Sequence, residues 1–275
     1  MKKINIRFGV IILGAMFPIV LLVLMHSYSM IVSKKQIVAE MSMVKKLAYL
    51  APEISGLVHE LQKERGASAG FVGSKGKKFQ SKLPGLRADT DTQQRRMHDK
   101  TVEFEPESFD PILAKSLATA HESLNRLGAI RNQIDGFQLS VPKLAAFYTK
   151  SITQLLKIIE NASTLSTNYK VNRGITAYIA LLQAKERAGL ERAMGSVGFG
   201  SGKFDNAVYV KFARLVEAQR SFYSFIQTFA TPEELQFYTD TVSGKAVEEV
   251  ERMRKIAMQY PETGSTEGVD GTYWF

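Results

Sequence analysis

The sequence of 275 residues contains no cysteine, a single tryptophan and only four histidines. Without cysteine the chain forms no disulfide, holds no cysteine-ligated zinc or iron–sulfur centre and offers no thiol nucleophile. None of the histidines follows a glutamate at the three-residue spacing that di-iron helical bundles use. Walker, HExxH and G-x-S-x-G motifs are also missing. We therefore expect a protein that is not an enzyme and that needs no metal or cofactor.

Blocks of like charge are lacking too. The formal net charge is +9, but the basic residues alternate with acidic ones, as they do on solvated helix faces. No cluster of basic and aromatic residues stands out, so nucleic acid is not an expected partner.

The chain begins with a long apolar run. Residues 8–32 carry no charge and are flanked by basic residues on both sides: Lys2, Lys3, Arg7, Lys34 and Lys35. At a rise of ~1.5 Å per residue, such a helix crosses a hydrocarbon core of ~30 Å. We predict an uncleaved membrane anchor over residues 1–35, with a cleaved signal peptide as the alternative. Residues 36–275 would then lie outside the cytoplasmic membrane, in the periplasm of a bacterium.

Beyond the anchor, helical spacing predominates and no alternating strand pattern occurs. We predict an all-α fold of about eight helices with short connections, which is typical of helix bundles. The expected helices are residues 36–50, a helix opened by Pro52, and then 79–100, 112–134, 141–165, 172–197, 205–229 and 231–260.

One short pattern occurs twice, about 127 residues apart. The first copy runs from Glu64-Arg65 to Phe79, and the second from Glu191-Arg192 to Phe204. Each has a Glu-Arg pair, a run of small residues, a phenylalanine, a turn rich in Gly, Ser and Lys, and a closing phenylalanine. The repeat suggests two related halves with arginines in equivalent positions.

Both arginines lie where a cation needs a partner. Arg65 shares a helical face with Leu57 and Leu61, and Arg192 shares one with small residues such as Ala188. One interpretation is an internal ion pair with an acid, namely Glu64, Glu191, Glu186 or another. The other is a dry cationic pocket, in which two forked guanidinium groups clamp one planar oxyanion.

At these residues the sequence resembles a known family. Residues 57–70, LVHELQKERGASAG, and residues 184–193, AKERAGLERA, are similar to the two signatures of the nitrate- and nitrite-sensing (NIT) domain. Trp274-Phe275 resembles the closing segment of that family, so the resemblance covers residues 36–275. It implies an all-helical sensor of two four-helix bundles that binds nitrate or nitrite between them.

The resemblance also implies roles for residues. The ligand-binding arginines would be Arg65 and Arg192, with Arg187, Ser68 and Ser196 as supporting residues. Because related domains occur in bacterial chemoreceptors and other sensor proteins, we expect a homodimeric transmembrane signalling receptor. A second membrane helix, a linker and an output domain would follow residue 275. The alternative is a membrane-anchored structural or interaction module, in which the arginines only form internal ion pairs.

Overall fold

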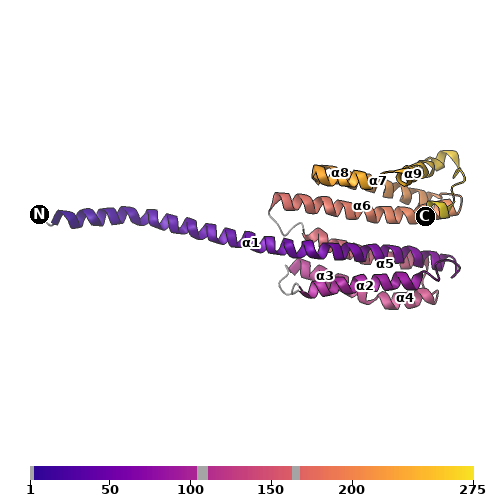
Figure 1. Ribbon diagram of the computed structural model, residues 1–275, viewed down its shortest axis with the longest axis horizontal. Coiled ribbons are helices and arrows are strands. Elements are labelled where there is room, and N and C mark those ends of the chain that lie inside the picture. The colour runs from indigo at the N-terminus through magenta and orange to yellow at the C-terminus, as the bar shows by residue number, and fades with distance from the viewer. Residues whose placement is uncertain (1–2, 104–110, 163–167) are drawn as a thin grey trace. The chain divides into compact units, whose positions relative to one another are not determined.

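The structure is a computed structural model that describes residues 3–103, 111–162 and 168–275, with side chains from residue 10 onward (Figure 1). These residues form helices and connecting turns and no strand, which confirms the all-α prediction. Contacts divide the chain into two units, Met1–Lys45 and Lys46–Phe275, and each is described by itself below.

Ten helices are assigned within the described residues. Their bounds are α1 (Lys3–Gly73), α2 (Leu83–Glu103), α3 (Pro111–Asn125), α4 (Leu127–Asp135), α5 (Val141–Ala162), α6 (Tyr169–Gly200), α7 (Asn206–Phe229), α8 (Pro232–Thr241), α9 (Lys245–Thr263) and α10 (Gly271–Trp274).

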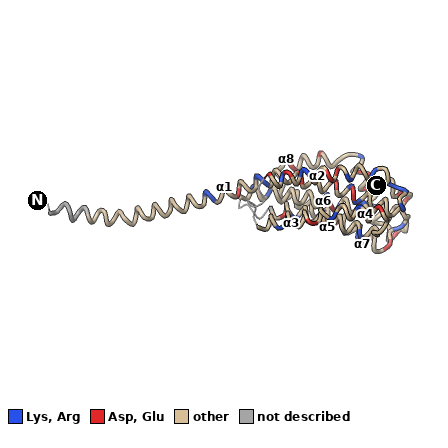
Figure 2. The backbone as a smooth tube through the Cα atoms, turned by 90° about the horizontal axis from the view of Figure 1, so that it is seen from below, with Lys and Arg blue, Asp and Glu red and all other residues tan. Residues whose placement is uncertain are grey.

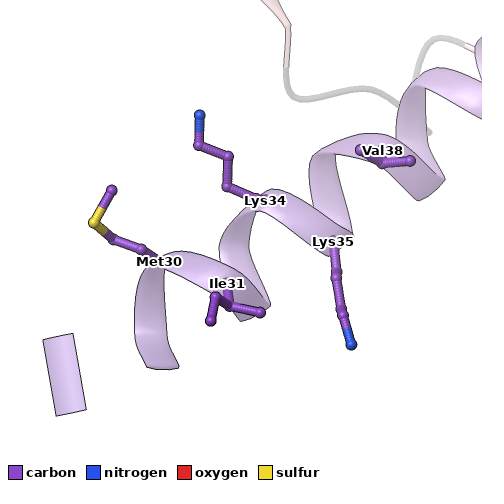
Figure 3. Close-up of a pocket in the computed structure, with 5 residues that line it drawn as sticks. All are labelled: Met30, Ile31, Lys34, Lys35 and Val38. Atoms are coloured by element: carbon purple, nitrogen blue, oxygen red, sulfur yellow. The ribbon is translucent and has the colours of Figure 1, made fainter. Parts of the chain in front are cut away.

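The first unit is the N-terminal part of α1. Its large apolar side chains from Val10 to Met41 are exposed. Residues 10–33 carry no charge, and Figure 2 shows a long tan stretch in this part of α1. By length and composition this stretch is able to cross a membrane, with a mean hydropathy of 2.4 over its most apolar window. A hollow beside it is lined by five residues of this one helix, two of them lysines (Figure 3). It has no opposing wall and does not enclose a ligand.

The second unit consists of two packed four-helix bundles. The first is formed by the rest of α1 with α2, α3 and α4 in succession, and α5; the second is formed by α6 to α9 (Figure 1). In the first bundle, α1 contributes a fully buried stripe at helical spacing: Leu50, Ile54, Leu57 and Leu61. In the second, the core is centred on aromatic and aliphatic side chains of α6, α7, α9 and α10, such as Phe199, Phe212, Ile256 and Trp274. Helix α6 of the second bundle packs against α5 of the first.

Several helix boundaries follow from local signals. Asp205 caps α7 by accepting the backbone N–H of Val208 at 2.9 Å. Thr231 and Glu234 form a reciprocal capping box at the start of α8, with Pro232 as the first helical residue. Both starts were predicted because the capping side chain and the residues after it are contiguous in sequence.

Other predicted boundaries were wrong. A new helix was expected to open at Pro52, but α1 continues through this proline, whose exposed ring costs the helix one backbone hydrogen bond. The helix expected over residues 112–134 is broken at Arg126, where the backbone N–H bonds Ser123 three residues back. The helix expected over residues 231–260 is broken before Gly244, whose φ of 89° favours glycine.

Some predictions fall on residues outside those described. These are the basic side chains of Lys2, Lys3 and Arg7, and residue 165, the predicted end of the helix expected over residues 141–165. The start of α2 is described, and it lies at Leu83 instead of residue 79.

Candidate functional site

The acid of the first Glu-Arg pair lies inside the first bundle. Glu64 is fully buried and receives two hydrogen bonds from the Arg131 guanidinium of α4, at 2.7 and 2.9 Å. The hydroxyl of Tyr148 on α5 donates to the same carboxylate at 2.8 Å. Burial and the Glu64 charge raise the pKa of Tyr148. Arg131 also donates to the half-exposed Asp91 of α2. Glu64 therefore joins α1 to α4 and α5.

The acid of the second pair is arranged in the same way inside the second bundle. Glu191 is buried and receives two hydrogen bonds from the Arg254 guanidinium of α9, at 2.7 and 2.6 Å. The Gln219 amide of α7 donates to it at 2.6 Å. Arg254 also pairs with Glu251 on its own helix. Each acid of the repeat therefore binds a forked arginine from a later helix of its own bundle.

The closing phenylalanines of the repeat are also equivalent. A Cβ on Gly70 would lie 2.4 Å from the Phe79 ring, and a Cβ on Gly198 would lie 2.3 Å from the Phe204 ring. In both copies a glycine therefore lets a phenylalanine from the following turn lie directly on the helix backbone. Phe79 has a positive φ of 65°, a strained conformation for a bulky residue.

The arginine of the first pair crosses from the first bundle to the second. Arg65 is buried, and its two terminal nitrogens donate to Glu186 of α6 at 2.6 and 3.2 Å. It also donates to the Thr149 hydroxyl at 2.9 Å. Gln62, one helical turn earlier on α1, donates to the same Glu186 at 2.7 Å. Gly189 makes room for the crossing, since a Cβ there would lie 3.3 Å from the guanidinium.

The arginine of the second pair has a different environment. No acidic side chain of the described residues forms an ion pair with Arg192. Its side chain is partly exposed to solvent, so it is not enclosed on a helix face as Arg65 is. Its guanidinium lies over the Phe275 ring at 5.1 Å, and its backbone carbonyl accepts the Trp274 indole N–H at 2.8 Å. Trp274 lies on Gly195, where a Cβ would approach its ring to 2.2 Å. The short helix α10 thus covers one side of the second motif.

Positive groups of α1 and α6 gather around the two arginines. Burial and the charge of Arg65 lower the pKa of Arg192. Burial, followed by the charges of Lys185 and others including Arg192, lowers the pKa of His59. Burial also lowers the pKa of Lys185, against a raising effect of Glu60. The charge of Arg65 thus disfavours the charge of Arg192, and the charges of Lys185 and Arg192 disfavour that of His59.

The three predicted supporting residues are placed differently. Arg187 donates to Gln183 and lies 5.2 Å from the Phe222 ring of α7, and no described contact joins it to Arg65. Ser68 is fully buried beside Tyr148 in the first bundle. The hydroxyl of Ser196 is buried one helical turn after Arg192 and has no hydrogen-bond partner among the described residues.

Sequence reasoning missed the residues that hold the site together. Among them are Arg131 and Arg254, which follow the acids of the repeat by 67 and 63 residues. An alignment of the two halves of the sequence would have shown this similar separation. Gln62 and Thr149 give no such signal, because their roles arise only when the bundles pack. Among the described residues, no group of three or more His, Asp or Glu side chains is arranged to hold a metal ion.

Comparisons with known proteins identify the family and the fold. The sequence profile of the family described as "Nitrate and nitrite sensing" matches residues 56–275. The nitrate regulatory protein of Klebsiella oxytoca is 26% identical over 226 residues, which cover 82% of this chain and 56% of that protein. The chain thus spans just over half the length of this relative. The solved structure of the NasR transcription antiterminator is similar in fold, with a TM-score of 0.80 and 21% identity over 90% of this chain and 67% of the other.

Proposed function

The chain belongs to the nitrate- and nitrite-sensing family, and from this premise we propose that its two-bundle unit binds nitrate or nitrite between Arg65 and Arg192. The ligand would be held by groups from α1 and α6. The unit would act as a sensor and not as an enzyme.

The observation that carries this proposal is the state of Arg192. It is a permanent cation without an acidic partner among the described residues, and burial and the nearby charge of Arg65 lower its pKa. A small anion between the two arginines would remove their repulsion. Guanidinium is planar and forked, so it fits a planar oxyanion through paired hydrogen bonds. The unpartnered Ser196 hydroxyl is a further donor within one helical turn of Arg192.

The membrane context is a second part of the proposal. The exposed apolar stretch of α1 supports an anchor over residues 1–35, with the sensor over residues 36–275 outside the cytoplasmic membrane. Such a protein would be a homodimeric transmembrane receptor. Arg187 and Ser68 would then support the site indirectly, through the packing of α6 and of the first bundle. The similar NasR structure is that of a transcription antiterminator, so the anchor would adapt this fold to a different setting.

The location is testable because the chain has no cysteine. Ser81, exposed between α1 and α2, is replaced by cysteine in the full chain. In intact cells whose outer membrane has been opened, a membrane-impermeant maleimide is expected to label Ser81→Cys. Labelling only after the inner membrane is lysed would place the sensor in the cytoplasm and contradict this part of the proposal.

Ligand binding is tested by calorimetric titration of the full chain in nanodiscs. Nitrate or nitrite is expected to bind, and chloride and sulfate to bind much more weakly. Arg192→Ala should abolish binding and Arg192→Lys should weaken it, because lysine keeps the charge and loses the fork. Arg220→Ala, which removes an exposed arginine of α7 paired with Glu217, is the matched control. No heat with either anion, in a folded wild-type protein, would contradict the proposal.

One observation favours a second candidate function. Arg65 already has a buried acidic partner in Glu186, as expected for a structural or interaction module whose arginines only fix helix packing. In that case neither the wild type nor Arg192→Ala would bind nitrate or nitrite. The titration above therefore separates the two candidates.

A further inference from the structure

Glu186 is a buried acid that the proposed function does not use. It lies on α6 with 2% of its surface exposed, and all of its hydrogen bonds in the described structure come from α1. Arg65 gives it two of these bonds and Gln62 gives the third. A buried carboxylate with three donors is strongly held, because charge-assisted hydrogen bonds are about twice as strong as neutral ones.

The two carboxylate oxygens of Glu186, which contact Arg65, are arranged like two oxygens of the proposed ligand. It presents two oxygens in one plane to two nitrogens of the Arg65 guanidinium. Nitrate and nitrite present the same pair of oxygens with the same single negative charge. In the described structure, Glu186 thus fills the bidentate position that such an anion would take on Arg65.

We infer that Glu186 is an internal competitor for the ligand, which must displace this carboxylate from Arg65 in order to bind. The inference rests on the proposed function, since it needs an anion that binds at Arg65. It also gives binding a structural consequence. Without ligand, α1 and α6 are joined by the Arg65–Glu186 pair. With ligand, they are joined by an anion between Arg65 and Arg192, while Gln62 alone remains on Glu186.

Two features of the chain agree with a change of partner at Arg65. Gly189 leaves the second terminal nitrogen of Arg65 without a side chain over it on the α6 side. The longer of the two Arg65–Glu186 hydrogen bonds, 3.2 Å, belongs to that nitrogen. The longer hydrogen bond therefore belongs to the nitrogen that faces Gly189.

The test is nitrate titration of the full chain in nanodiscs, comparing wild type with Glu186→Gln. Removing the competing charge is expected to tighten nitrate binding about tenfold or more, as one charge-assisted hydrogen bond is lost from the unliganded state. Glu186→Asp keeps the charge but shortens its reach, so it should also tighten binding, by a smaller factor. Circular dichroism and a thermal melt show that each variant is folded.

Glu60→Gln is the matched control. Glu60 acts on His59 and Lys185 in the same region but does not bind Arg65, and its loss is expected to change nitrate affinity less than about threefold. If both variants bind nitrate more tightly by the same factor, the inference is overturned, because the effect then reflects the loss of any nearby negative charge. Unchanged or weaker nitrate binding in folded Glu186→Gln would also overturn it and leave the proposed function standing. If neither wild type nor Glu186→Gln binds nitrate or nitrite, the proposed function itself fails.

Discussion

The acid of each Glu-Arg pair binds an arginine of its own bundle, Glu64 in the first copy and Glu191 in the second. The arginines beside them differ. Arg65 pairs with Glu186 of the other bundle, whereas Arg192 meets no acid among the described residues. The repeated glutamate therefore serves the fold of each half, and only the arginine is available for a role between the halves. A repeated motif need not have one repeated function.

The largest expected effect is the loss of either acid of the repeat. Glu64→Ala and Glu191→Ala should each lower the free energy of unfolding by about 3–5 kcal/mol, because each leaves a partly buried arginine without its main partner. The loss of Glu64 should cost more, since Arg87 also lies within 4.0 Å of it. Urea unfolding followed by circular dichroism measures both. Glu217→Ala, in an exposed pair, is the control and should cost less than about 0.5 kcal/mol.

The two arginines should contribute very differently to the free energy of unfolding, although the two acids beside them are bound in the same way. Arg65→Ala leaves Glu186 buried and unpaired and should cost about 3 kcal/mol of unfolding free energy, whereas Arg192→Ala should change it by no more than about 0.5 kcal/mol. Nitrate at a hundred times its dissociation constant should stabilise wild type by about 2.7 kcal/mol. It should leave the stability of Arg192→Ala unchanged. Equal costs for the two alanine variants without ligand would remove the contrast between the copies.

A smaller effect tests the equivalence of the two turns. Gly70→Ala and Gly198→Ala push a methyl group into a phenylalanine ring and should each cost about 1–3 kcal/mol. The Gly70 variant should cost more if the strained Phe79 backbone has no room to relax. Gly66→Ala is the matched control in the same helix, where a Cβ meets nothing within 4 Å. There alanine should stabilise the helix by up to about 1 kcal/mol, and thermal melts compare the three.

The smallest expected effect is on pH dependence. Burial and the charges of Lys185, Lys63 and Arg192 hold the pKa of His59 below 6.5, against the raising effect of Glu60. A bound anion would favour protonated His59, so nitrate affinity should rise as pH falls below 6.5, by less than tenfold. Without ligand, the free energy of unfolding should instead decrease as pH falls below 6.5, because the unfolded chain takes up this proton more readily. His59→Gln should flatten both trends, and an affinity that falls with pH in wild type would contradict the link.

Sequence patterns predicted those parts of the fold that depend on neighbouring residues. The all-α class, the cap at Asp205 and the capping box at Thr231 all follow from residues within one helical turn. The breaks at Arg126 and Gly244 were missed because neither interrupts the apolar spacing of its segment. The continuation of α1 through Pro52 was missed because local preference alone gives proline a first-turn position.

The candidate site was predictable only in part, for a related reason. The repeat identified Arg65 and Arg192, and the apolar face of α1 showed that Arg65 needs a partner. Among several acids, only the packing of α6 against α1 selects Glu186. The contrast between a paired and an unpaired arginine is a property of the assembled bundles and has no signature in either motif copy.

The contact of Trp274 with the second motif has a practical consequence for spectroscopy. The chain has one tryptophan, and its indole N–H donates to the Arg192 backbone carbonyl. Indole emission depends on local polarity and hydrogen bonding. The Trp274 fluorescence should therefore respond to changes at Arg192, the residue on which the proposed binding depends. A displacement of α10 from α6 would change the emission wavelength of residues 1–275, without a label and without a background signal from any other tryptophan in these residues.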